Sequence, residues 1–127
     1  MAQNIHEIIQ VATTARQSFE KDAIPRPLLS SLFKNYNPDF LDVDNYIDFS
    51  LKRFPKDNCW LASVYLRHVL GEGDVVEGAY DLEVHQYLQI GKLAVDITAD
   101  QFGGPPVYVG PIVEPWVAGR IMQPFDS

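Results

Sequence analysis

The chain has 127 residues, of which 46% are apolar, and its formal net charge is -7. This length and composition predict a single domain over residues 1–127 with one hydrophobic core. The ten lysines and arginines form no cluster that could follow a phosphate backbone, so we expect no nucleic-acid partner. No apolar run is long enough to span a membrane, and no basic and then apolar export signal follows Met1. We therefore expect a cytoplasmic protein that makes no membrane contact, and its single cysteine fits a reducing compartment.

The first third of the chain is predicted to be helical. Residues 3–20 place apolar side chains at helical spacing, which indicates an amphipathic helix. Prolines 25 and 27 end that helix, residues 28–33 begin a short second one, and a third begins near Asp44 after a loop. Several aspartates lie in this region, but the glycine and the further acidic ligand of a calcium loop are missing, so we predict no metal site.

The only cysteine, Cys59, is expected in the first turn of the next helix. Asp57 or Asn58 is suited to the N-cap and Gly71 to the C-terminal stop. At a helix N-terminus the free backbone N–H groups and the helix dipole stabilise a thiolate, and the same N–H groups can face an oxyanion. Free cysteines are also common as small buried hydrophobes, and this alternative applies to Cys59 taken alone.

Residues 83–98 predict a β-hairpin with a two-residue turn at Gly91-Lys92, because polar and apolar residues alternate on both sides of it. Pairing Ile90 with Leu93 forms an apolar core face. The opposite, polar face carries His85, Tyr87, Gln89, Ala94, Asp96 and Thr98. In this register Asp96 is diagonal to His85, within side-chain reach. The alternative is that both are ordinary polar residues of a solvated strand.

The remaining histidines are poorer partners for the cysteine. His68 follows Cys59 by nine residues on the same helix, which places it on the opposite face and roughly 13 Å along the axis. His6 lies in the N-terminal helix. A thiol, an imidazole and a carboxylate are the groups that a thiol hydrolase uses for attack, proton transfer and orientation. The sequence therefore predicts a catalytic triad of Cys59, His85 and Asp96, without a cofactor or a metal.

The segments around the hairpin complete the prediction. Residues 75–80 read as a first strand, residues 107–109 as a short later strand, and the proline-rich tail as a surface segment. The glycine- and proline-rich loop at residues 103–106 is expected to form a wall of the active-site entrance. Trp60 and Tyr87 are the candidate apolar contacts for a substrate.

Residues 58–63 on a helix, His85 on a strand and the segment Val95-Asp96-Ile97-Thr98-Ala99-Asp100-Gln101-Phe102 resemble the papain-like and transglutaminase-like cysteine hydrolases, particularly their small bacterial members. The resemblance covers residues 53–102 well and the N-terminal third loosely. It implies an α+β fold of papain-like (transglutaminase-like) type, with a helical N-terminal part and a nucleophile helix packed on a small antiparallel sheet. It also implies that Cys59 is the nucleophile, His85 the general base and acid, and Asp96 the orienting carboxylate.

The resemblance implies cleavage, transfer or deamidation of amide and thioester bonds in a protein or peptide substrate. The bacterial relatives include toxin and effector domains, which would permit delivery out of the cell. We slightly favour a glutamine deamidase or amidase over a peptidase, because a chain of this size has little room for an extended peptide cleft. A thioester-dependent acyltransferase and a non-catalytic binding or toxin-neutralising module on the same fold remain open.

The chain departs from the papain-like pattern at the oxyanion hole. A glutamine often precedes the cysteine in that family, whereas this chain has none between Gln17 and Gln86. Asn58 is the candidate oxyanion donor, together with the backbone N–H of Cys59. A helix-capping role explains Asn58 equally well.

Overall fold

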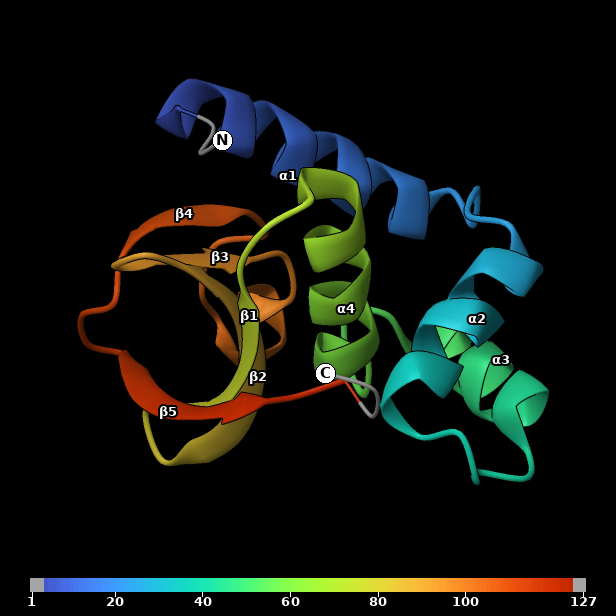
Figure 1. The fold of residues 1–127 in the computed structure, drawn as a ribbon. Coiled ribbons are helices and arrows are strands. Elements are labelled where there is room, and N and C mark those ends of the chain that lie inside the picture. The colour runs from blue at the N-terminus through green and yellow to red at the C-terminus, as the bar shows by residue number, and fades with distance from the viewer. Residues whose placement is uncertain (1–3, 125–127) are drawn as a thin grey trace.

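The computed structural model describes residues 4–124, and within them four α-helices precede a five-stranded antiparallel open sheet (Figure 1). The α+β class predicted from the sequence is confirmed. The helices are α1 (Ile5–Glu20), α2 (Arg26–Tyr36), α3 (Val43–Arg53) and α4 (Cys59–Leu70). The strands are β1 (Asp74–Tyr80), β2 (Glu83–Ile90), β3 (Leu93–Asp96), β4 (Tyr108–Pro111) and β5 (Trp116–Met122), and the short 3-10 helix η1 (Ala99–Phe102) follows β3. None of the described helices is long and apolar enough to cross a membrane.

The helices begin and end close to the predicted positions. Asn4 caps α1 by accepting a hydrogen bond from the Glu7 N–H at 2.9 Å, and residue 3 of the predicted helix lies outside the described residues. The second helix is longer than predicted because the prolines at 25 and 27 lie at its start, where a missing N–H removes no helical bond. Helix α4 begins at Cys59 and ends before Gly71, which has the left-handed φ of +73°.

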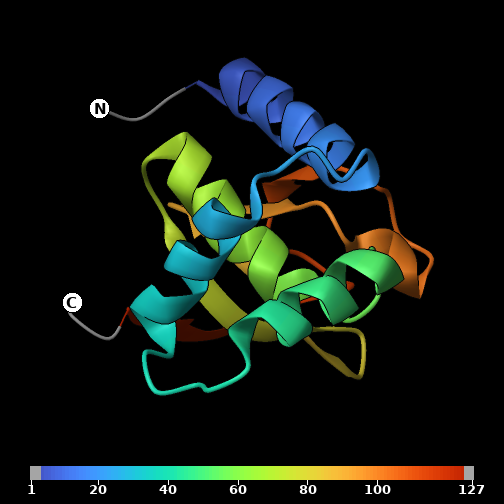
Figure 2. The ribbon, with the colours of Figure 1, turned by 90° about the vertical axis from the view of Figure 1, so that its right-hand side faces the viewer.

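The hairpin register is confirmed. Leu88 pairs with Val95, Gln89 with Ala94 and Ile90 with Leu93, as the alternation of apolar residues requires. Gly91 adopts a φ of +58° in the turn. Helix α4 lies against the face of the sheet that carries Leu88, and the helices cover this face when the molecule is viewed from the helical side (Figure 2).

The opposite face of the hairpin is not solvated, so the alternative that His85 and Asp96 are ordinary polar residues of a solvated strand is wrong. A second buried cluster covers it, made of Val76, Tyr80, Tyr87, Ala94, Ala99 and Trp116. The sheet order is β4-β3-β2-β1-β5, yet rings from its two edge strands, Tyr108 and Trp116, stack with centroids 3.7 Å apart. The open sheet therefore curves enough for side chains of its two edge strands to touch, and its concave face encloses a core of its own (Figure 1).

The C-terminal tail is the other departure from prediction. Residues 116–122 form β5, which pairs with β1, rather than a segment that only follows the surface. Two glycines permit the close approach of these strands, because a Cβ atom on Gly78 or on Gly119 would overlap the facing backbone. Tyr108 begins β4 within one residue of the predicted strand at 107–109.

Candidate active site

The turn that carries Cys59 is fixed to α3 by Ser50, which is fully buried. The Ser50 hydroxyl donates to the carbonyl of Asp57 at 2.8 Å, and the Asn58 side-chain amide donates to the Ser50 carbonyl at 3.0 Å. Asp57 adopts a φ of +53°, in the left-handed region. These two hydrogen bonds hold the thiol-bearing end of α4 in one orientation.

His85 and Asp96 form a buried pair, as the sequence predicted from their diagonal positions. His85 Nε2 lies 2.6 Å from Asp96 Oδ2, and both side chains are at most 1% exposed. Asp96 also accepts hydrogen bonds from Trp116 Nε1 at 2.8 Å and from the Thr98 N–H at 2.9 Å. Both carboxylate oxygens are therefore occupied, and the carboxylate cannot turn away from the imidazole.

The surroundings of His85 are aromatic. Rings of Tyr80, Tyr87 and Phe102 lie with centroids 5.2 to 6.4 Å from the imidazole. Burial lowers the pKa of His85, but the hydrogen bond with Asp96 and the neighbouring Cys59 more than offset this effect and raise the pKa from 6.5 to about 9. The imidazolium is thus the main form of His85 at neutral pH.

The two ring nitrogens of His85 have different surroundings. Nε2 is bound to Asp96, and Nδ1 is buried without a hydrogen-bond partner among the described residues. Cys59 contributes to the raised pKa of the imidazole, so its thiol lies close to the ring. In the imidazolium Nδ1 carries a proton, so it is the nitrogen that is left to donate to the sulfur of Cys59.

The thiol itself donates to Gln86, with Sγ 2.7 Å from Oε1. The sequence analysis did not select Gln86 as a site residue. A usable signal was present, because Gln86 has the same strand parity as the apolar Leu88 and Ile90 and so is a polar residue on the core-facing side of β2.

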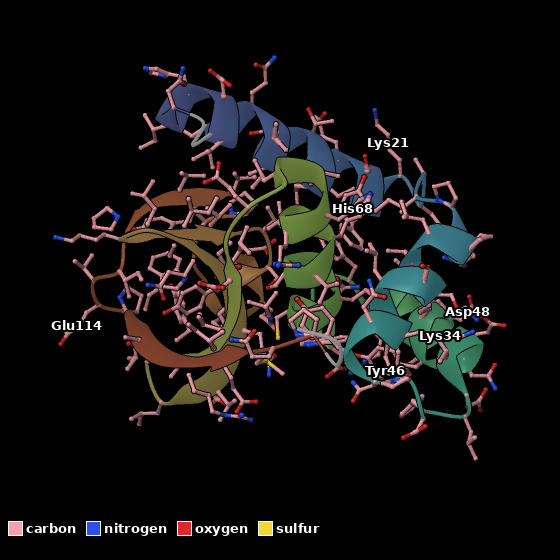
Figure 3. The ribbon with its side chains drawn as sticks, in the orientation of Figure 1. Lys21, Lys34, Tyr46, Asp48, His68 and Glu114 are labelled. Carbon is pink, nitrogen blue, oxygen red and sulfur yellow. The ribbon has the colours of Figure 1, made fainter. Side chains whose placement is uncertain are left out.

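Cys59 opens onto a surface pocket of about 280 Å³. Trp60, a predicted substrate contact, lines this pocket together with Tyr46 and Phe49 of α3, Asp57 and Gln86. In Figure 3 Tyr46 lies beside the N-terminal end of α4, whereas His68 lies toward the other end of that helix. The distant position predicted for His68 is therefore confirmed.

Three of the predicted site features lie elsewhere. Tyr87 was expected to contact a substrate, but it is fully buried in the concave core and its hydroxyl donates to the Val117 carbonyl at 3.0 Å. The loop at residues 103–106 contributes no lining residue to the pocket beside Cys59. The amide nitrogen of Asn58 is committed to Ser50, and its side chain is buried rather than directed into the pocket.

A second carboxylate, Asp100, follows Asp96 by four residues. Asp100 pairs with Arg16 at 2.7 Å. Within residues 4–124 no three His, Cys, Asp or Glu side chains come together as a metal-binding group. No protein-family model, no curated protein and no solved structure matches the chain.

Proposed function

We propose that the chain is a papain-like or transglutaminase-like thiol hydrolase that acts on a carboxamide or peptide bond through Cys59, His85 and Asp96. The observation that carries this proposal is the buried pair of His85 and Asp96 at 2.6 Å, whose free Nδ1 is left beside a cysteine at a helix N-terminus. Buried titratable groups with a raised pKa are concentrated at functional sites, so the placement of this pair next to a thiol supports a chemical role.

In the proposed reaction the Cys59 thiolate attacks the carbonyl carbon, and His85 is the imidazolium. The first-turn backbone N–H groups of α4, which have no partner within the helix, would donate to the oxyanion. The His85 imidazolium protonates the leaving ammonia or amine at Nδ1. The neutral imidazole then takes a proton from water, which attacks the acyl-enzyme and releases the acid. Asp96 keeps the ring oriented throughout.

The pocket favours a protruding side chain over an extended backbone. Its volume of about 280 Å³ and its wall of Tyr46, Phe49 and Trp60 suit the apolar stem of a glutamine side chain. We therefore retain the preference for a protein glutamine deamidase or amidase over a peptidase. Acyl transfer from a thioester would use the same residues with an amine in place of water.

One observation favours a second function. The thiol donates to Gln86 and makes no hydrogen bond with His85, which would suit an inert cysteine in a non-catalytic binding or toxin-neutralising module. A pure binding module has no need of the buried His85 and Asp96, and for this reason we place it second.

The test is mass spectrometry of a mixed protein substrate after incubation with the protein. We expect glutamines to gain about one dalton, as hydrolysis of an amide to an acid must give, without new peptide termini. The gain should be absent with Cys59→Ala and should fall by orders of magnitude with Asp96→Asn, which retains the size of the side chain but not its charge.

The other outcomes separate the alternatives. New termini that depend on Cys59, with no mass gain at glutamine, would replace the deamidase with a peptidase. Amine adducts at glutamine would indicate acyl transfer. No Cys59-dependent product of any kind would favour the binding module.

A further inference from the structure

A row of polar side chains crosses the sheet from the thiol to the edge strand. Gln86 of β2 pairs with Glu77 of β1 in the strand ladder, and Glu77 pairs in turn with Arg120 of β5. The Gln86 Nε2 donates to Glu77 Oε2 at 3.1 Å, and Glu77 Oε1 accepts from Arg120 Nε at 3.2 Å and lies 3.1 Å from its Nη2. With Cys59 donating to Gln86, the row is continuous over four residues.

The row determines which way the Gln86 amide faces. A carboxylate can only accept hydrogen bonds, so the amide must present its NH₂ group to Glu77. The carbonyl oxygen is then the group left for Cys59, and it lies 2.7 Å from Sγ. A carbonyl can accept from a thiol but would repel a thiolate, so this orientation favours the protonated form of the cysteine.

The same row explains why His85 Nδ1 has no partner. The thiol directs its one proton at Gln86, and a thiol sulfur is only a weak acceptor for the proton on Nδ1. Nδ1 is consequently buried without a hydrogen bond, although Cys59 is close enough to influence the ring. Gln86 and His85 thus compete for the thiol.

We propose that Gln86 is a positioning residue for Cys59. Glu77 and Arg120 hold its amide so that the resting cysteine keeps its proton on Gln86, and the reaction begins when the sulfur leaves Gln86, loses that proton to water and, as a thiolate, accepts a hydrogen bond from the protonated Nδ1 of His85. This inference rests on the proposed function. In this proposal the orientation of the Gln86 amide determines whether Cys59 is in its resting or its reactive form.

The test measures the rate at which iodoacetamide alkylates Cys59 in the folded protein between pH 5 and 9. Gln86→Leu removes the acceptor, and we expect the rate at pH 7 to rise about 2- to 10-fold, the factor that corresponds to one hydrogen bond. The rate should also reach its plateau at a lower pH than in the unmodified protein. Glu77→Gln, which frees the amide to turn, should give a smaller increase.

Two further variants isolate the effect. Gln89→Leu, on the same strand but bonded only to the Gly91 carbonyl, should leave the rate unchanged. Adding His85→Gln to Gln86→Leu should abolish the gain, because the released thiol then has no imidazole to turn toward. A greater exposure of the sulfur alone would persist in that double variant.

The results that would refute the role of Gln86 differ from those that would refute the proposed hydrolase activity. If Gln86→Leu and Glu77→Gln fold but alkylate no faster, Gln86 does not position the thiol, even where His85→Gln slows alkylation and the hydrolase proposal stands. An equal gain in Gln89→Leu would also refute it. If His85→Gln has no effect in either background, the hydrolase proposal itself fails.

Discussion

At the scale of single residues, the surroundings of Asp96 explain why His85 can be buried and charged. An isolated imidazolium in an aromatic core would lose its proton, since desolvation disfavours the charged form. Here the carboxylate supplies the opposite charge at 2.6 Å, and Trp116 and Thr98 fix that carboxylate in turn. The pair is therefore a site where protonation and folding are linked.

This linkage gives a prediction for stability against pH. The folded-state pKa of His85 is about 9 and the unfolded value about 6.5, so the contribution is fully present below pH 6.5 and is lost as pH rises through 9. We expect the free energy of unfolding to fall by up to about 3 kcal/mol over this range. Urea unfolding at pH 6, 7.5 and 9.5 measures the change.

His85→Gln provides the control for this measurement. Glutamine can still donate to Asp96 but does not titrate, while His6 and His68 are present in both proteins and cancel in the comparison. Parallel pH dependences in the two proteins would contradict the high pKa of His85.

At the scale of elements, one segment serves both the site and the core. Asp96 binds His85, Thr98 donates to Asp96, Asp100 binds Arg16, and Phe102 packs edge-on against the imidazole with ring centroids 5.2 Å apart. The sequence was sufficient to predict the first of these contacts, because apolar alternation determines the hairpin register. It was insufficient for the others, which depend on how far the sheet curves.

Strand β5 was missed for a local reason. Prolines flank it, and Gly119 interrupts its alternation, so the segment has the composition of a loop. Its importance is tertiary, because it delivers the Trp116 indole to Asp96. Gln86 was missed because its partner Glu77 is on another strand, and the pairing of β1 with β2 was not predicted residue by residue.

A substitution at Gly119 tests whether β1 and β5 must approach each other this closely. In Gly119→Ala the new Cβ would overlap the Glu77 carbonyl oxygen, so β5 must move away from β1. We expect a loss of about 1–3 kcal/mol in the free energy of unfolding, typical of overpacking, and a weaker bond from Trp116 to Asp96. Thermal unfolding and the indole N–H signal in NMR report the two effects.

A neighbouring substitution controls for general sensitivity of this strand. Ala118→Ser changes an exposed side chain of β5, and we expect it to alter stability by no more than about 0.5 kcal/mol. Equal stability of Gly119→Ala and Ala118→Ser would show that the strands can separate without cost.

At the scale of the whole molecule, the three residues of the proposed site come from two layers that must be held together. Cys59 belongs to the helical layer and His85 and Asp96 to the sheet. Arg16 of α1 joins the two. Its guanidinium donates to the Ile97 carbonyl at 2.9 Å, immediately after Asp96, and lies 4.7 Å from the centroid of the Phe54 ring, in the segment that leads to Cys59.

Arg16→Met therefore tests whether this single cation holds the layers in register. Methionine fills a similar space, but Asp100 then loses both of its bonds to the guanidinium, at 2.7 and 2.9 Å, and the Ile97 carbonyl loses its donor. Breaking one side of this partly buried pair is expected to cost about 1–3 kcal/mol, which urea unfolding would measure. Arg26→Met, which removes only exposed pairs with Asp22 and Asp48, should cost less than about 1 kcal/mol.

Replacing Asp100 by leucine in the Arg16→Met protein should restore much of the loss, because no charge is then left unpaired. Equal losses for Arg16→Met and Arg26→Met would mean that apolar packing alone keeps Cys59 beside His85.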